Sequence, residues 1–465
     1  MAMWITRPRN ITHHLETNIG FLEFFKYQRI WLRTSSYSNP LPSNLIAKNY
    51  GSTSPPLLRD WASFFTARRY KSENAAKQVV DEEKQALDFL GGSVTFTSDL
   101  EFISEYPEKK VHCYRVLDDN GYPITSTRLP QVSNEITMKM YRDMVTLQIM
   151  DAIFYEAQRQ GRICFYATTT GEEAVNIAPA AALTPHDVIL PQYREPGVLL
   201  WRGFTLQEFA NQLFANKEDY GKGRQMHVHY GSNKLNCFTM SAPIATQLPQ
   251  AVGAAYSLKM EKKDACAVTF LWGWRQHSYG NPNSFSYAAT MGGPSVPHYR
   301  SSDGIAVKGQ AYGIRSTQVD GNDPLAVYTA VRAAREMAIV EQRPILIEAL
   351  TYRVGHHSTS DDSTKYRPAD EIEFWRNERN PVARFRKWIE RNGWWSEKED
   401  SQFRIEVRQQ VMQAIQAAER IEKPPLSEMF TDVYDQTPSN LQEQEEMIRE
   451  AIKRHPKDYP SDLPV

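Results

Sequence analysis

The amino-acid sequence predicts an α/β fold, in which a doubly wound and mostly parallel sheet carries a helical C-terminal extension. Three short runs, at residues 187–191, 266–271 and 344–350, consist mainly of apolar residues. Runs that are apolar on both faces are typical of central parallel strands covered by helices. Residues 205–214 and 323–342 show helical periodicity between these runs. The prediction rests on this alternation of strands and helices.

A long helix is expected to open the α/β domain, which we place at residues 133–370. Ser133 can cap this helix, because a serine hydroxyl accepts a hydrogen bond from a free backbone N–H of the first turn. Apolar residues then recur at helical spacing, and Gly161 can end the helix in a left-handed conformation. The preceding segment, residues 73–132, looks irregular apart from a predicted strand at 112–118.

The last part of the chain, residues 371–465, is expected to form the helical extension. Asn380 is a suitable cap for its first well-marked helix, and Gly393 is a suitable stop. Ser439 and Gln442 have the spacing of a capping box, in which the two side chains satisfy free N–H groups at a helix start.

Composition excludes several classes of protein. The chain has 465 residues, of which 54 are Lys or Arg and 55 are Asp or Glu, so it lacks the excess of cations that a generally basic nucleic-acid binder needs. No apolar run is long enough to predict insertion in a membrane. The four cysteines lie far apart without a CxxC pair, which favours packing cysteines in a reducing compartment over disulfides or a zinc site.

The first 72 residues differ in charge from the rest of the chain. They contain ten cations and three acids, and residues 34–54 are rich in Ser and Thr. A basic, hydroxyl-rich and acid-poor start is typical of an organelle transit peptide. We therefore predict that residues 1–72 direct import into the mitochondrial matrix, with a plastid as the second choice. The alternative is a disordered basic arm.

Residues 190–204 form the first candidate site, because they follow a predicted strand. In open α/β sheets, ligands bind beyond the carboxyl ends of the strands. Tyr193 and Arg194 would lie there, and the planar fork of arginine suits a diphosphate because it donates two parallel hydrogen bonds. The alternative is a structural pair between Arg194 and the carboxylate of Glu195.

The second candidate site extends from a glycine-rich stretch at 220–231 into residues 236–260. Neutral oxygens occur here on Ser241, Thr246 and Gln247, and backbone carbonyls such as that of Pro243 can add more. A neutral shell of oxygens would suit a monovalent cation, since hard cations prefer oxygen ligands. The alternative is an ordinary helix start with hydroxyl caps.

The third candidate site is the polar loop at residues 351–368, which leaves a predicted strand. It contains two histidines, two aspartates and six Ser or Thr residues. A histidine at a strand end can donate to phosphate or move protons, and such a loop is a suitable phosphorylation target. A metal site built from His356 and His357 is disfavoured because neighbouring residues of an extended chain point to opposite sides. The alternative is a solvated loop.

Six segments in this order resemble one family, the alpha subunit of the thiamine-diphosphate-dependent decarboxylase component of branched-chain 2-oxoacid dehydrogenases. They are residues 155–166, 190–204, 220–233, 241–256, 302–323 and 343–367. The resemblance covers roughly residues 85–460, and the stretch GHHSTSDD at 355–362 favours the branched-chain member over the related pyruvate enzyme. It implies a sheet of the thiamine-diphosphate-binding type.

The resemblance also implies roles for individual residues. Those implied to contact the cofactor are Tyr193, Arg194, Ala242, Ile244 and His357. Those implied to hold a structural potassium ion are Ser241, Pro243, Thr246 and Gln247. His357 would be the catalytic residue that assists acylation of a lipoyl group, and Ser358 would be an inhibitory phosphorylation site. Ala242 departs from the family, which has serine there, so a hydroxyl donor is lost.

The implied function is oxidative decarboxylation of branched-chain 2-oxo acids, with transfer of the acyl group to lipoamide. The implied cofactors are thiamine diphosphate, Mg²⁺ and K⁺. The implied partners are a beta subunit in an α2β2 heterotetramer, a lipoyl-bearing acyltransferase core, and a regulatory kinase and phosphatase. Neither nucleic acid nor a membrane is expected as a partner.

Residues 272–304 depart from the family. The family holds its magnesium through a Gly-Asp-Gly or Gly-Glu-Gly turn and an asparagine pair, yet no acid occurs here between Asp264 and Asp303. The codons of Trp272-Gly273-Trp274-Arg275, read one base later, can spell Gly-Asp-Gly. We therefore hypothesise a frame error with a missing segment. The alternatives are a non-catalytic structural subunit and, for the substrate, a pyruvate dehydrogenase alpha subunit.

Overall fold

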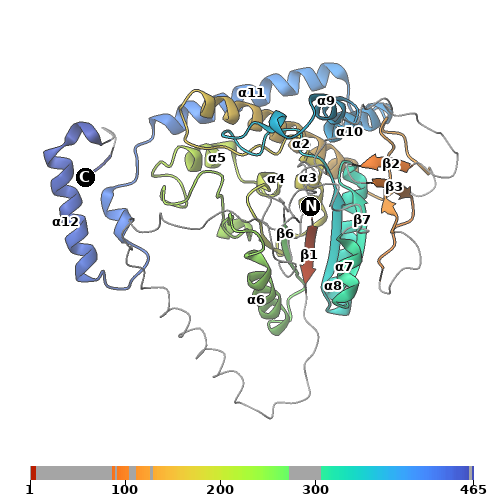
Figure 1. The fold of residues 1–465 in the computed structure, drawn as a ribbon, viewed down its shortest axis with the longest axis horizontal. Helices are drawn as coiled ribbons and strands as arrows, with labels where there is room; N and C mark the ends of the chain where they lie inside the picture. Colours follow the sequence, from red (N-terminus) through yellow and green to blue (C-terminus); the bar gives the residue numbers. More distant parts are fainter. Residues whose placement is uncertain are drawn as a thin grey trace, which may run out of the picture. The chain divides into compact units, whose positions relative to one another are not determined.

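An eight-stranded mixed sheet organises the chain (Figure 1), with strand order β2-β3-β4-β7-β8-β1-β6-β5. The computed structural model describes residues 2–6, 86–89, 92–103, 111–125, 129–271, 305–459 and 463–465. All of these belong to one compact unit, Met1–Arg9 with Glu83–Val465; the second unit, Asn10–Glu82, lies outside the described residues. The strands are β1 (Ala2–Thr6), β2 (Ala86–Phe89), β3 (Gly92–Thr97), β4 (Cys113–Tyr114), β5 (Val188–Leu190), β6 (Ala267–Leu271), β7 (Arg315–Asp320) and β8 (Ile345–Leu350).

Six strands run in the same direction, which confirms an α/β fold with a mostly parallel sheet. Strands β3, β4, β7 and β8 pair in parallel, as do β5 and β6. Strand β1 is antiparallel to both β6 and β8, so β6 and β8 point the same way. The carboxyl ends of β5 and β8 therefore lie at the same edge of the sheet, where ligands bind in open α/β folds. The strands predicted at 187–191, 266–271 and 344–350 are confirmed as β5, β6 and β8.

Strand β1 is a central strand that comes from the extreme N-terminus. Ala2 is the register partner of Leu271 in β6 and of Glu348 in β8. These residues lie within the segment that we expect to be a cleavable leader. The eight-stranded sheet thus includes residues of the predicted leader.

The helices cover the sheet in layers. In the described part of the chain they are α2 (Asn134–Arg159), α3 (Glu173–Ala182), α4 (Pro196–Trp201), α5 (Leu206–Leu213), α6 (Gln247–Met260), α7 (Ala306–Ala311), α8 (Pro324–Glu341), α9 (Ala369–Asn377), α10 (Pro381–Arg391), α11 (Glu397–Arg420) and α12 (Ser439–Arg454). Helix α8 packs on β7 and β8 and also on α3, while α6 packs on β5 and β6. Helix α2 contacts α3 and lies alongside α11 (Figure 1). One large apolar core joins these layers.

Local sequence signals explain several helix ends. The Ser133 hydroxyl accepts the backbone N–H of Ile136, as predicted, and Gly161 after α2 has a φ of 74°. Asn380 caps α10 through its side-chain oxygen, which also confirms a prediction. The capping box predicted at Ser439 was wrong, because Ser439 is already helical and Gln442 donates instead to the Thr437 carbonyl.

Other expectations were met or corrected by the described residues. Strands β2 and β3 pair antiparallel where irregular chain was predicted. All four cysteines are free; Cys113, Cys237 and Cys266 are buried, as expected of packing cysteines, whereas Cys164 is exposed. No helix in the described ranges has the length and apolar character needed to cross a membrane.

Candidate active site

The loops that follow β5 and β8, two strands separated in the sheet by β1 and β6, meet at Arg194. The arginine follows β5 and is only 1% exposed. Its Nη2 donates to the backbone oxygen of His357 at 2.7 Å and lies 2.7 Å from His357 Nδ1. Its Nη1 donates to the Thr168 carbonyl at 2.9 Å. The structure thus brings together Arg194 and His357, two residues that are 163 positions apart in the sequence.

The carboxylate of Glu195 shapes the turn that carries Arg194. Its Oε2 accepts the backbone N–H groups of Gln192 at 2.9 Å and of Arg194 at 3.1 Å. Burial raises the pKa of Glu195 to about 8. The Glu195 carboxyl group therefore accepts hydrogen bonds from the backbone of its own turn, while the Arg194 guanidinium donates to His357 and Thr168.

Tyr193 stands beside this contact. Its ring meets the ring of His357 edge-on, with centroids 6.4 Å apart and an interplanar angle of 82°. The Arg194 guanidinium carbon lies 5.2 Å from the Tyr193 ring centroid, which is within cation–π range. Tyr193, Arg194 and His357 therefore form one contiguous group.

The electrostatic setting keeps His357 neutral. Burial and then the charges of Arg194 and Arg353 lower the pKa of His357 to about 3. Because Arg194 can only donate, Nδ1 of His357 is the acceptor and Nε2 carries the proton. The side chain of His357 thus offers an N–H donor at neutral pH.

Hydrogen bonds hold the loop after β8 in one conformation. The carboxylate of Asp361 accepts the His357 backbone N–H at 2.8 Å and the Tyr366 hydroxyl at 2.6 Å. Arg367 donates to the carbonyls of Arg353 at 2.5 Å and of Gly355 at 2.9 Å. The loop is therefore anchored on both sides of His357, in contrast to the alternative of a freely solvated loop.

Glycine is required at position 355 of this loop. A Cβ atom there would lie 2.3 Å from the Thr168 side chain, which is closer than side chains approach each other. The backbone of the loop therefore passes tightly against the segment that accepts a hydrogen bond from Arg194.

The two residues next to His357 have different environments. Ser358 is buried, at 6% exposed, and its hydroxyl lies 3.0 Å from that of Ser360. His356 Nδ1 accepts the backbone N–H of Ser363 at 3.0 Å, so its role in this loop is structural. The described residues contain no group of three or more His, Cys, Asp or Glu side chains suited to a metal ion.

The oxygen-rich segment 241–247 is joined to the turn that carries Arg194. The backbone N–H of Ser241 donates to the Gln192 carbonyl at 2.7 Å. The Gln247 amide donates to the carbonyls of Pro191 at 3.2 Å and of Ser241 at 2.9 Å. Its own oxygen, Oε1, is buried without a hydrogen-bond partner.

The oxygens of this segment are of the type that binds a monovalent cation. Thr246 directly precedes the first residue of α6, and its side chain forms no capping hydrogen bond. Gln247 presents an unsatisfied buried oxygen, the kind of ligand that a monovalent cation requires. Ala242 and Pro243 are exposed, and Ile244 is 45% exposed.

Several residues of the site were not predicted from the sequence. They lie in the segment that leads into the first residue of α3 and in the loop after β8, and they are Thr168, Glu172, Glu173 and Arg353. Both carboxylate oxygens of Glu172 are buried without a partner, and burial raises the pKa of Glu172 to about 7 and that of Glu173 to about 8. Two adjacent acids ahead of an apolar helix, next to a glycine, were the available signal.

Replacing Glu173 with glutamine tests the cost of this buried acid. A raised pKa means that the folded protein keeps its proton up to about pH 8, whereas the unfolded chain loses it near pH 4.5. The stabilising contribution is therefore full below that lower value and is lost as pH rises toward 8. We expect Glu173→Gln to raise the free energy of unfolding by about 2 kcal/mol at pH 8.5 and to change it little at pH 4.

Denaturant unfolding at both pH values measures this difference, with the exposed Glu446→Gln on α12 as the control. If Glu173→Gln and the wild type had the same pH dependence, the protonated state assigned to Glu173 would be wrong.

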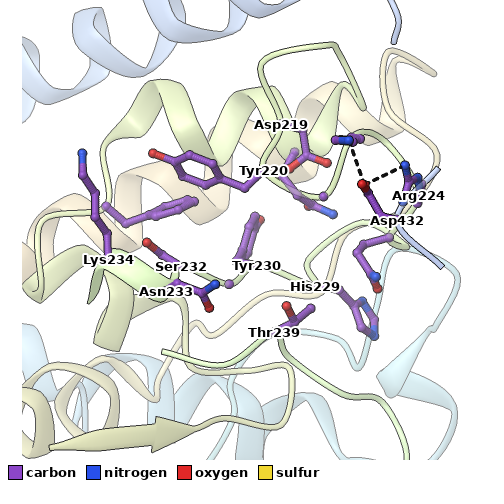
Figure 2. Close-up of a pocket in the computed structure, with 16 residues that line it drawn as sticks. Asp219, Tyr220, Arg224, His229, Tyr230, Ser232, Asn233, Lys234, Thr239 and Asp432 are labelled. Atoms are coloured by element: carbon purple, nitrogen blue, oxygen red, sulfur yellow. Dashed lines mark hydrogen bonds and ion pairs between the residues drawn. The ribbon is translucent and has the colours of Figure 1, made fainter. Parts of the chain in front are cut away.

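The glycine-rich stretch at 220–231 lines a different cavity. Figure 2 shows this cavity. It has a volume of about 520 Å³ and is lined by residues between positions 204 and 239, together with Asp432. Arg224 within it contacts the Asp432 carboxylate at 3.1 Å. A Cβ atom at Gly231 would lie 2.6 Å from Thr239, so internal packing already accounts for this glycine. The cavity shares no lining residue with the Arg194 site.

Residues 272–304, where the sequence lacks the expected magnesium ligands, lie outside the described residues. They directly follow Leu271, the last residue of β6. The comparison with families is interrupted at the same place. A family model described as "Dehydrogenase E1 component" matches residues 141–273 and 288–427, which is more than half of the chain.

The chain is also similar to curated proteins along most of its length. It is 64% identical over 396 residues to 2-oxoisovalerate dehydrogenase subunit alpha 2, mitochondrial, of Arabidopsis thaliana, covering 82% of this chain and 84% of that protein. It is 53% identical over 479 residues to subunit alpha 1 from the same plant, covering 99% of both. The human mitochondrial subunit alpha is 42% identical over 390 residues, which cover 80% of this chain and 87% of the human protein.

Proposed function

Because this chain belongs to the dehydrogenase E1 component family, we propose that it is the alpha subunit of the decarboxylase component of a mitochondrial branched-chain 2-oxoacid dehydrogenase. It acts in oxidative decarboxylation of branched-chain 2-oxo acids and passes the acyl group to lipoamide. The relatives above are named for 2-oxoisovalerate, which favours this substrate class over pyruvate. The observation that carries the proposal is the contact between Arg194 and His357 at the carboxyl edge of the sheet.

The cofactor of this subunit is thiamine diphosphate, bound at the edge of a doubly wound sheet. The cofactor supplies the electron sink for decarboxylation, and the protein supplies positioning and electrostatics. Arg194 and Tyr193 would hold the diphosphate, because a guanidinium fork matches phosphate oxygens. Ala242 and Ile244 would contact it from the second segment. His357, neutral and protonated on Nε2, would donate a hydrogen bond near the reacting carbon.

A potassium ion would be held by Ser241, Pro243, Thr246 and Gln247. The unsatisfied buried oxygen of Gln247 supports this site, and neutral ligands favour a monovalent cation over Mg²⁺. The ion would brace the segment that carries Ala242 and Ile244 against the turn that carries Arg194.

Magnesium finds no ligand set in the part of the chain that the structure describes. A second candidate function, a non-catalytic structural subunit that still assembles with a beta subunit, rests on the sequence between Asp264 and Asp303. The family match is broken at residues 274–287, and the sequence has no acid between Asp264 and Asp303.

Sequencing the transcript across codons 264–304 decides between these readings. If the sequence arose from a frame error, we expect an overlapping frame at Trp272–Trp274 that encodes Gly-Asp-Gly, together with additional codons that restore the asparagine pair. Coding DNA without such a frame would contradict the frame hypothesis and favour the structural subunit.

The proposed domain organisation assigns residues 1–72 to a mitochondrial leader, 73–132 to an N-terminal segment, 133–370 to the cofactor-binding domain and 371–465 to the helical extension. The proposed partners are a beta subunit in an α2β2 assembly and the lipoyl-bearing acyltransferase core.

A kinase and a phosphatase would act on Ser358. Because Ser358 is 6% exposed, its modification requires the loop to open locally.

Replacing Ser358 with glutamate tests the regulatory part of the proposal. The negative charge would enter a buried position beside His357 and should disturb the Arg194–His357 contact. We expect kcat/KM for the 2-oxo acid to fall by about tenfold or more. The control is Ser360→Glu, which places the same charge at an exposed position of the loop. Equal losses in both variants would argue against a special role for Ser358.

The proposed function is tested by turnover of the purified αβ assembly. With thiamine diphosphate and Mg²⁺, we expect decarboxylation of 3-methyl-2-oxobutanoate to exceed that of pyruvate, and no turnover by the alpha chain alone. An αβ assembly that forms but neither binds the cofactor nor turns over either substrate would identify the structural subunit. A preference for pyruvate would reassign the substrate.

A further inference from the structure

Helix α6 is apolar on two opposite faces. Its inner face, with Ala251, Ala255 and Leu258 buried, packs on Leu190 of β5 and Ala267 of β6. A helix on the surface of a sheet needs only this one apolar face, and its opposite face is normally polar. Figure 1 shows α6 beside β6, and the outer face of the helix is the feature that the fold leaves unexplained.

The outer face carries a row of exposed apolar side chains. Val252, Tyr256 and Met260 are 58%, 56% and 64% exposed, and they follow each other at four-residue spacing along the helix. A single exposed apolar residue is ordinary, but a contiguous row on one face marks an interaction site. Pro249, one turn earlier, is also exposed.

Gly253 lies on the same face, and none of the residues that the structure describes packs against it. A Cβ atom added there would meet no atom within 4 Å, and the residue does not have a positive φ. Glycine in the middle of a helix is destabilising relative to alanine, so it needs a reason. Close approach of another backbone is the physical reason that remains, because only glycine lets two helices cross without a side chain between them.

The outer face is continuous with the open side of the candidate active site. Helix α6 begins at Gln247, whose side chain binds the turn that carries Arg194. The segment just before it exposes Ala242, Pro243 and Ile244. A partner seated on α6 would therefore also reach the exposed part of the site and could exclude water from it.

We propose that the outer face of α6, formed by Pro249, Val252, Gly253, Tyr256 and Met260, is the docking surface for a helix of the beta subunit, with Gly253 at the crossing point. This inference rests on the proposed function, which requires a beta subunit to complete the site. Continuity with the site favours the beta subunit over a second copy of the alpha chain, because a second copy carries the same cofactor residues and would add no complementary ones.

The test compares assembly of the full-length alpha chain with the beta subunit by sedimentation. We expect Val252→Glu and Gly253→Leu to weaken αβ association at least a hundredfold. Gly253→Ala adds a single methyl group; it should weaken association several-fold while leaving the thermal midpoint of the alpha chain unchanged or higher, an outcome that a merely structural role would not produce. The matched control is Ile405→Glu on α11, a β-branched residue of similar exposure, 53%, in the middle of a helix.

The outcomes separate this inference from the proposed function. If the wild-type alpha chain binds beta, and the α6 variants bind it as well as Ile405→Glu does, the docking surface is overturned while the proposed function stands. Loss of alpha–alpha association alone in the α6 variants would show that the face belongs to a second copy, which also overturns it. If the wild-type chain fails to bind beta at all, the proposed function fails first.

Discussion

Replacing Arg194 with lysine is expected to reduce kcat/KM of the αβ assembly for the 2-oxo acid by about a hundredfold or more, mainly through weaker cofactor binding. The guanidinium now bonds Thr168 with one nitrogen and His357 with another. Lysine keeps the positive charge but cannot reach both partners in fixed geometry, so His357 would lose the donor that sets its tautomer. Steady-state kinetics at increasing thiamine diphosphate concentrations measure this loss.

Arg202→Lys is the matched control for this change. Arg202 also donates to backbone carbonyls through both terminal nitrogens, including those of Leu235 and Asp187, but it does not contact His357. We expect this variant to be less stable but to keep the apparent affinity for the cofactor. If Arg194→Lys showed wild-type cofactor dependence, the diphosphate would not bind at Arg194.

The second large effect is expected for His357→Ala. Removal of the imidazole should slow transfer of the acyl group to a lipoyl domain by about 100- to 10,000-fold, the range that a positioned proton donor contributes. Decarboxylation measured with an artificial electron acceptor should fall less, because it bypasses the lipoyl group. Rapid-mixing assays with each acceptor separate the two steps.

The pH profile adds an independent check on His357. Its lowered pKa, about 3, keeps the folded ring neutral, so activity that depends on the neutral ring is retained until the pH falls to about 3. The contribution of the neutral ring to stability is full above pH 6.5 and is lost as pH falls toward 3. The exposed His186→Ala serves as the control. A wild-type profile that rises with a midpoint near pH 6.5 and disappears in His357→Ala would contradict the neutral state.

Local patterns were sufficient to predict much of the fold. Strands β5, β6 and β8 are apolar on both faces, so burial could be read from residue type alone. Strand β7 is equally buried but carries Arg, Ser, Thr and Gln, and it was not predicted. Its polar groups are satisfied inside the protein: Gln318 donates to Glu348 at 3.2 Å, and Ser316 donates to the Ala306 carbonyl at 2.5 Å. The sequence of β7 alone does not reveal these hydrogen-bond partners.

The central position of β1 could not be predicted either. Its residues read as the start of a basic leader, and its pairing with β6 and β8 depends on segments more than 260 residues away. Charge and composition describe only the segment itself. Whether it forms a strand, and where, depends on the neighbouring strands with which it can pair.

The two central residues of the candidate site could be predicted from the sequence, but the residues around them could not. Arg194 and His357 stand at strand ends, and the rule that parallel strands present their carboxyl ends together was enough to expect them near each other. Thr168 contributes only a backbone carbonyl, which every residue possesses, so its identity carried no signal. Arg353 and Glu172 are buried and interact electrostatically with Arg194. This proximity becomes evident only in the folded chain.

A crystal structure of the αβ assembly grown with thiamine diphosphate tests the central claim most directly. The account predicts the diphosphate against Arg194 and Tyr193, within reach of His357 Nε2, with a cation beside Gln247. A diphosphate bound elsewhere would contradict it, for example in the cavity of Figure 2 among Lys222, Arg224 and Lys234. An assembly that stays empty at saturating cofactor would contradict it equally.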